Sequence, residues 1–133
     1  KGCKMVVGCR WDLKEAPLRW FGRKALNLIA SLITGHYLVD LNSGMRVFDR
    51  KLATAYSPIL CETFSFTTSL TMSFVGDGHK NVWIPIDVKP RAKGQSHVRV
   101  IHHGLITLGY MMWIGLAIRT REIRRWIRSL LGL

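Results

Sequence analysis

Residues 5–35, "MVVGCRWDLKEAPLRWFGRKALNLIASLITG", predict a strand followed by a long helix. The run at 5–8 is short, apolar and ended by glycine, which is typical of a central strand. Pro17 suits the first turn of a helix, and Gly35 suits the left-handed position just beyond its end. Between them, apolar residues recur with helical spacing at Leu18, Phe21, Ala25, Leu28 and Leu32. We therefore expect an α/β fold that begins with this strand and helix.

The next segment, residues 37–50, predicts two short strands joined by a turn. Its centre at 42–44 is Asn-Ser-Gly, a typical turn sequence, and it separates two apolar runs. Residues 51–60 then predict a short helix that ends near Pro58.

Residues 63–75, "TFSFTTSLTMSFV", mix aromatic, β-branched and hydroxyl side chains. We interpret them as a helix with one apolar face, although a strand fits the same composition. Residues 76–81 predict a loop. Residues 82–88 predict a strand in which Pro85 indicates an edge position or a bulge, because proline cannot donate to a strand ladder.

The composition predicts an anionic partner. The chain has 133 residues, at most one domain, and its 20 Lys and Arg against 8 Asp and Glu give a net charge of +12. Most of the excess lies in residues 89–103 and 119–133, which suggests nucleic acid, a phosphorylated ligand or lipid headgroups. Because 48% of the residues are hydrophobic, we favour a membrane surface. The three cysteines show no metal-ligand spacing, so no metal site is predicted.

The C-terminal third combines an apolar run with a basic amphipathic segment. Residues 104–118 are uncharged, but as a helix they measure only about 22 Å, shorter than the roughly 30 Å core of a bilayer. In residues 119–133 one helix face is apolar and the other carries arginines, a pattern that suits a helix lying in a membrane interface. The alternative is an amphipathic helix packed on its own domain. The apolar face comprises Ile123, Trp126, Ile127, Leu130 and Leu131.

Two other basic features suit an anionic ligand. Residues 87–99, "DVKPRAKGQSHVR", are polar, basic and broken by proline and glycine, which predicts a loop that holds an anion. Arg19, Arg23 and Asn27 are spaced four residues apart, so they share one helix face. From spacing alone, this stripe is either solvated or a binding surface.

Three motifs in order, "VVGCR", "DLNSGMRVF" and "IPIDVKPRAKGQSHVR", resemble the C-terminal half of a family 2 glycosyltransferase of GT-A fold. The nearest resemblance is to the polyprenyl-phosphate sugar transferases, a group that includes dolichol-phosphate mannose synthase. It implies that residues 1–103 are the acceptor-side part of a GT-A domain and that residues 104–133 form apolar and then basic membrane-associated helices.

The resemblance also implies an activity. Such enzymes transfer a sugar, with inversion, from a nucleotide-sugar donor to a polyprenyl phosphate at the cytosolic face of a membrane. The N-terminal nucleotide-binding half, with its Asp-x-Asp and its Mg²⁺ or Mn²⁺, would precede Lys1, and no Asp-x-Asp occurs in this sequence. We therefore expect the metal ligands to lie outside the chain and the 133 residues alone to be inactive.

Nine residues match positions of the family's site. The resemblance implies catalytic roles for Asp40, in the turn beside the site, and for Arg91, near the donor diphosphate. Alternatively, Asp40 caps its own turn and Arg46 pairs with an acid. Arginine suits phosphate because its planar fork of donors matches phosphate oxygens. The implied phosphate and diphosphate ligands are Arg10, Arg23, Asn27, Ser43, Arg46, Ser96 and His97, the last at a position that is often lysine.

The competing hypothesis is a non-enzymatic basic module that binds anionic membrane or nucleic acid. We do not expect nucleic acid, because no known binding motif occurs and the tryptophans lie in apolar runs. Salt distinguishes these partners: binding to nucleic acid would collapse as salt is added, whereas attachment through the apolar run would persist.

Overall fold

The three strands in the described part of the chain form one mixed sheet. Strand β1 (Met5–Cys9) is its middle strand and pairs antiparallel with β2 (Arg46–Phe48) and parallel with β3 (Asn81–Pro85). The central position predicted for residues 5–8 and the edge position predicted from Pro85 are both confirmed. The computed structural model describes residues 2–11, 16–63, 65–89 and 99–131.

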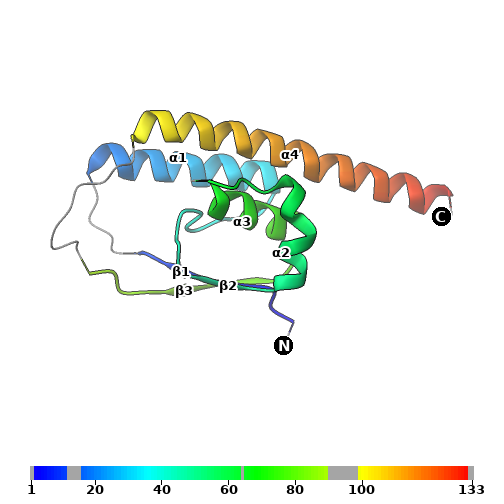
Figure 1. Ribbon diagram of the computed structural model, residues 1–133, viewed down its shortest axis with the longest axis horizontal. Helices are drawn as coiled ribbons and strands as arrows, with labels where there is room; N and C mark the ends of the chain where they lie inside the picture. Colours follow the sequence, from blue (N-terminus) through cyan, green and yellow to red (C-terminus); the bar gives the residue numbers. More distant parts are fainter. Residues whose placement is uncertain (1, 12–15, 64, 90–98, 132–133) are drawn as a thin grey trace.

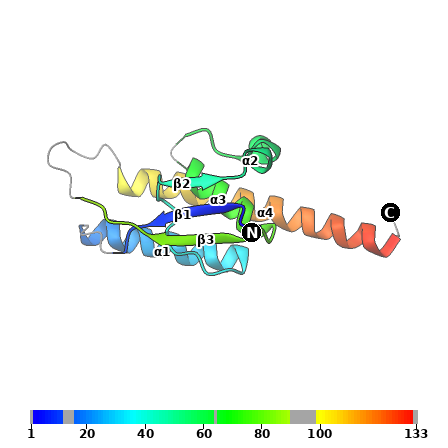
Figure 2. The same ribbon diagram turned by 90° about the horizontal axis from the view of Figure 1, so that it is seen from below.

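The helical elements are α1 (Pro17–Thr34), α2 (Arg50–Tyr56), the 3₁₀ turn η1 (Ser57–Ile59), α3 (Phe66–Gly76) and α4 (Val100–Leu131). Helices α1, α3 and α4 lie on one side of the sheet in two layers, and α2 lies beside the edge strand β2 (Figure 1). Helices α1 and α4 run side by side in the outer layer, and α3 lies between them and the strands (Figure 1). Figure 2 views the molecule from the strand side, with the sheet in front of α1 and α4.

The predicted ends of α1 are confirmed by its local backbone chemistry, and the helix predicted over residues 51–60 forms as α2 followed by η1. Pro17 is the first residue of α1, and Gly35 ends it with a left-handed φ of +70°. The carboxylate of Asp49 accepts hydrogen bonds from the backbone N–H groups of Lys51 (3.0 Å) and Leu52 (3.2 Å). Such a cap satisfies donors that a helix cannot bond internally, so α2 begins at the next residue.

Helix α3 is enclosed on all sides. Its helical structure was predicted, but the expectation of one apolar face is wrong, because every residue from Thr68 to Val75 is buried. Two buried hydroxyl groups donate within the helix, Thr71 Oγ1 to the carbonyl of Thr67 at 2.7 Å and Ser69 Oγ to that of Phe66 at 2.9 Å. Thr68 Oγ1 donates outside the helix, to Asn42 Oδ1 at 3.0 Å, and Ser73 Oγ has no hydrogen-bond partner among the described residues. Small hydroxyl side chains, most of them hydrogen-bonded, allow one helix to pack against two layers.

Two apolar clusters hold the layers together. One joins the sheet to α2 and α3 through Met5, Val7 and Phe74. The other joins α1, α3 and α4 and includes Ala30, Met72, Val75, Met111 and Ile114. Trp83 of β3 packs against both clusters, so the sheet and the outer helices share one continuous core.

The first strand predicted within residues 37–50 does not form. Only Arg46–Phe48 is a strand in this segment. Residues 38–41 instead bond to side chains of α1: Ser31 Oγ accepts from the N–H of Leu38 at 3.0 Å, and Asn27 binds residues 39 and 41. Because side chains satisfy these backbone groups, the segment needs no strand partner.

The C-terminal segment is one helix of 32 residues, about 48 Å long. The apolar and basic parts therefore belong to a continuous α4 that begins before residue 104. By length and composition, Ile101–Leu131 could cross a membrane, although core helices of soluble proteins can meet the same criterion. Its basic half is tied to the fold by Arg121, which donates to Asp77 at 3.3 Å and lies over the ring of Tyr56.

The apolar stripe of α1 faces outward. Leu18, Phe21, Leu28 and Leu32 are exposed, whereas Asn27 on the polar face is buried. Helix α4 also exposes large apolar side chains on its outer surface: Ile101, Leu105, Met112, Trp113 and Leu116. Because the two helices lie side by side (Figure 1), the outer layer presents apolar surface from both.

Substitution of Gly76 should test the contact between α3 and α4. A Cβ at Gly76 would lie 2.4 Å from Cδ1 of buried Ile118, so Gly76→Ala should lower the free energy of unfolding by about 1–3 kcal/mol. Gly109→Ala is the matched control, because a Cβ there meets nothing within 4 Å and alanine favours a helix. Urea unfolding measures both, and equal midpoints for the two variants would contradict this packing.

Candidate functional site

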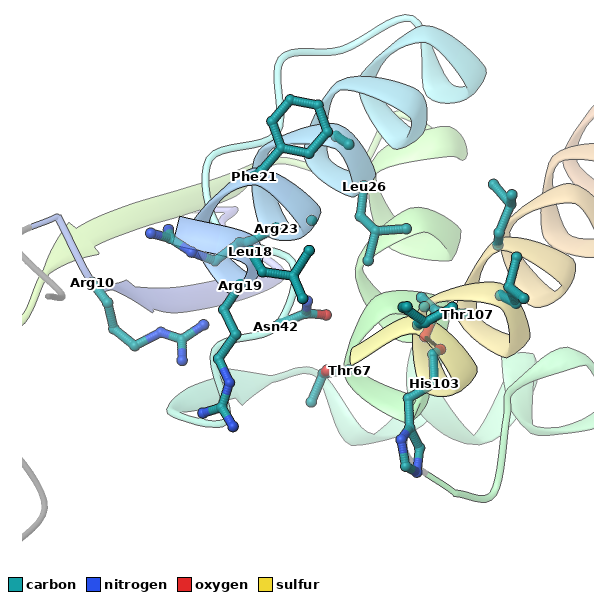
Figure 3. Close-up of a pocket in the computed structure, with 16 residues that line it drawn as sticks. Arg10, Leu18, Arg19, Phe21, Arg23, Leu26, Asn42, Thr67, His103 and Thr107 are labelled. Carbon is teal, nitrogen blue, oxygen red and sulfur yellow. Dashed lines mark hydrogen bonds between the residues drawn. The ribbon is translucent and has the colours of Figure 1, made fainter. Parts of the chain in front are cut away.

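A cavity of about 530 Å³ lies between α1 and the N-terminal part of α4. Figure 3 shows Arg10, Arg19 and Arg23 on one side of this cavity and His103 on the other. Apolar walls come from both helices: Leu18, Phe21 and Leu26 from α1, and Ile101, Leu105 and Leu108 from α4. The cavity thus combines an apolar trough with a cluster of cations.

Arg10, which follows β1, is held by Asp40. Its Nε donates to Oδ2 and its Nη2 to Oδ1 of Asp40, both at 2.8 Å, and its backbone N–H lies 3.3 Å from Oδ2. Asp40 is only 1% exposed. Burial raises the pKa of Asp40, but the hydrogen bonds and charge of Arg10 outweigh it, so this pKa lies below the ordinary 3.8. The carboxylate is therefore ionised near neutral pH and orients the Arg10 fork.

Asn27 sets the position of Asp40. Its Nδ2 donates to the carbonyl of Val39 at 2.6 Å, and its Oδ1 accepts from the N–H of Leu41 at 3.3 Å. These two bonds clamp the residues on either side of Asp40. Asn27 thus lies behind the cavity, whereas Arg19 and Arg23 of the same helix face line it.

Arg46 braces the turn from the other side. Its Nε donates to the carbonyl of Ser43 at 3.0 Å, and its Nη2 donates to that oxygen and to the carbonyl of Leu41 at 3.1 Å. Its Nη1 donates to Thr67 O at 2.8 Å and to Thr71 Oγ1 at 2.7 Å. All five N–H donors are therefore used. Burial lowers the pKa of Arg46 to about 10, so the group stays charged at neutral pH.

The predicted site residues separate into three groups. Arg10 and Arg23 line the cavity. Behind it, the turn and its braces form a bonded layer that consists of Asn27, Asp40, Ser43 and Arg46. In this layer Asp40 bonds Arg10, and the described partners of Arg46 are carbonyl and hydroxyl oxygens, so neither side chain makes the alternative contact considered from the sequence. Arg91, Ser96 and His97 lie outside the described residues.

Two basic side chains that line the cavity, Arg19 and His103, were not among the predicted site residues. Arg19 lies one helical turn before Arg23, so the spacing of the basic stripe already pointed to it. His103 lies far along the chain on α4, and nothing in the local sequence indicates that α4 packs beside α1. Only the tertiary contact between these helices brings His103 opposite the arginines (Figure 3).

The described residues offer no metal centre: none of their His, Cys, Asp and Glu side chains gather in threes that could hold an ion. Comparison with known proteins finds no match for this chain among protein-family models, curated proteins or solved structures. The properties of the site therefore follow from its own residues.

Replacement of Arg46 by lysine should destabilise the fold. Lysine has three donors on a flexible stem and cannot reproduce the five bonds, so buried carbonyl oxygens would lose partners. We expect Arg46→Lys to lower the free energy of unfolding by about 2–4 kcal/mol in denaturant titrations. Arg50→Lys, at an exposed position, should change it by less than about 0.5 kcal/mol; equal losses would contradict the brace.

The Arg10–Asp40 ion pair should make the free energy of unfolding depend on pH in the acidic range. Because the pKa of Asp40 is lowered in the folded state, its contribution is present above the unfolded pKa of about 3.9 and is lost as pH falls through the folded value. Asp40→Asn should therefore be less stable than the wild type at pH 6, and their unfolding free energies should converge toward pH 2. Parallel curves across this range would contradict the assignment.

Proposed function

We propose that this chain is the acceptor-side part of an inverting GT-A glycosyltransferase that uses a nucleotide-sugar donor and a polyprenyl-phosphate acceptor. The observation that carries the proposal is the cavity between α1 and α4, where three arginines meet an apolar trough. A polyprenyl phosphate has the matching chemistry, with an anionic phosphate at one end of an apolar chain.

The arginines suit the phosphate end of this ligand. Each guanidinium has a planar fork of donors that fits phosphate oxygens, and Asp40 fixes the orientation of the Arg10 fork. In such a transfer the new negative charge of the transition state develops on the departing diphosphate, so the acceptor-side arginines serve to bind and orient the attacking phosphate. The pattern of residues "VVGCR" and "DLNSGMRVF" supports the same assignment by resemblance.

The outer layer supports attachment to a membrane. Both α1 and α4 expose large apolar side chains, and exposed cations such as Lys24, Arg119 and Arg124 lie on the same two helices. Apolar helices flanked by cations bind anionic interfaces through both burial and charge. In our proposal, both helices lie along the cytosolic face, so the cavity opens where a lipid phosphate is found.

The donor side of the reaction rests on the resemblance. Arg91, Ser96 and His97 would approach the donor diphosphate, and a Mg²⁺ or Mn²⁺ ion would be held by ligands outside these 133 residues. The ion would stabilise the charge of the departing diphosphate. By itself, the chain would bind acceptor without transferring sugar.

Binding to lipid vesicles tests the proposal. The chain should bind neutral vesicles that contain polyprenyl phosphate more tightly than vesicles that contain the same amount of polyprenol. Arg23→Ala should weaken binding to the phosphate lipid about tenfold, because it removes a charge-assisted contact. Arg50→Ala removes the same charge from α2, away from the cavity, and should leave the affinity close to that of the wild type.

Two results would contradict the proposal. Equal affinity for polyprenyl phosphate and polyprenol would show that the cavity does not recognise phosphate. Equal loss for Arg23→Ala and Arg50→Ala, with binding that collapses as salt is added, would indicate a basic module that responds to surface charge alone.

A further inference from the structure

His103 lies in the first turn of α4 and lines the cavity opposite the three arginines. In Figure 3, the side chains of Arg19 and His103 extend on either side of Thr67. A ligand held by Arg10 and the two arginines of α1 is therefore placed between them and an imidazole of another helix.

The position of His103 is fixed by its surroundings. Its Nδ1 lies 2.9 Å from the carbonyl oxygen of Arg99, and because a carbonyl can only accept, the proton is on Nδ1. The carbonyl of His103 accepts from Thr107 Oγ1 at 2.8 Å, and that hydroxyl lies 2.8 Å from Ser65 Oγ. These bonds tie the start of α4 to the start of α3, so the imidazole is a preorganised group.

The charges around His103 favour an anion in the cavity. Arg99 lies just before α4, with its carbonyl oxygen at His103 Nδ1, and the arginines face His103 across the cavity. The N-terminal end of a helix also favours negative charge, and the first turn of α4 contains no acidic residue. An imidazolium donates hydrogen bonds from both nitrogens, so with Nδ1 at the carbonyl oxygen of Arg99 the other nitrogen, Nε2, can donate to a phosphate oxygen.

We propose that His103 is a further phosphate-binding residue, so that a bound lipid phosphate bridges α1 and α4. This inference rests on the proposed function, because it concerns the same cavity and the same ligand class. It adds a contact from the second helix. Phosphate recognition then requires the two helices to lie side by side, and the apolar chain of the ligand occupies the trough between them.

The test compares two neighbouring histidines. His103→Ala should weaken binding to neutral vesicles that contain polyprenyl phosphate by about tenfold, whereas His102→Ala, on the exposed side of the same turn, should bind as the wild type does. His103→Lys should restore most of the affinity, because it supplies a cation. Binding to vesicles that contain polyprenol should be the same for all variants.

A stability measurement separates binding from folding. The stability of each variant is measured by urea unfolding. If His103→Ala is less stable than the wild type, His103→Gln replaces it in the binding comparison, because glutamine keeps a hydrogen-bond donor but carries no charge. Wild-type affinity for the folded neutral variant, or equal losses for the two histidines, would overturn the role of His103 and leave the proposed function standing. If the wild type does not prefer polyprenyl phosphate to polyprenol, the proposed function and this inference both fail.

Discussion

The geometry of the site depends on the side chains that form hydrogen bonds with the backbone of residues 38–43. This segment crosses the interior without a strand or helix of its own, so its polar groups need partners from elsewhere. Asn27 supplies two bonds from α1, and Arg46 supplies its bonds from β2 while also binding α3. Because the segment is fixed, the Asp40 carboxylate occupies one position, and its two hydrogen bonds orient the Arg10 guanidinium. The geometry of the cavity is therefore set by neutral backbone groups and two polar side chains.

Elements with strong local signals could be predicted from the sequence. The apolar run before Gly8 favours a strand locally, and Pro17 and Gly35 favour the start and the end of a helix through their own backbone conformations. The predicted bounds of β1 and α1 therefore agree with the structure to within about one residue. The segment before β2 could not be predicted, because the groups that replace its strand partner lie on another element. Likewise, the sequence of α3 shows that it is a helix but not that it is enclosed by two layers.

The orientation of α1, which also shapes the site, could not be predicted from the sequence either. Its apolar stripe resembles the buried face of a globular helix, yet it points outward, and the polar Asn27 points inward. Periodicity gives the two faces of a helix but not which of them meets the core. The resemblance to the glycosyltransferases predicted Arg10 and Arg23 as phosphate ligands. The partner across the cavity required the packing of α4 on α1, which no local pattern encodes.

The pairing of Arg10 with Asp40 also has a consequence for turnover in the proposed enzyme. Asp40 neutralises one of the three guanidinium charges, so the arginine cluster keeps two positive charges before any proton on His103 is counted. A phosphate monoester carries close to two negative charges near neutral pH. Sugar transfer converts it into a diester with only one, which leaves part of the cluster uncompensated. Such a cavity holds the acceptor more strongly than the product, and product release becomes easier once the reaction has taken place.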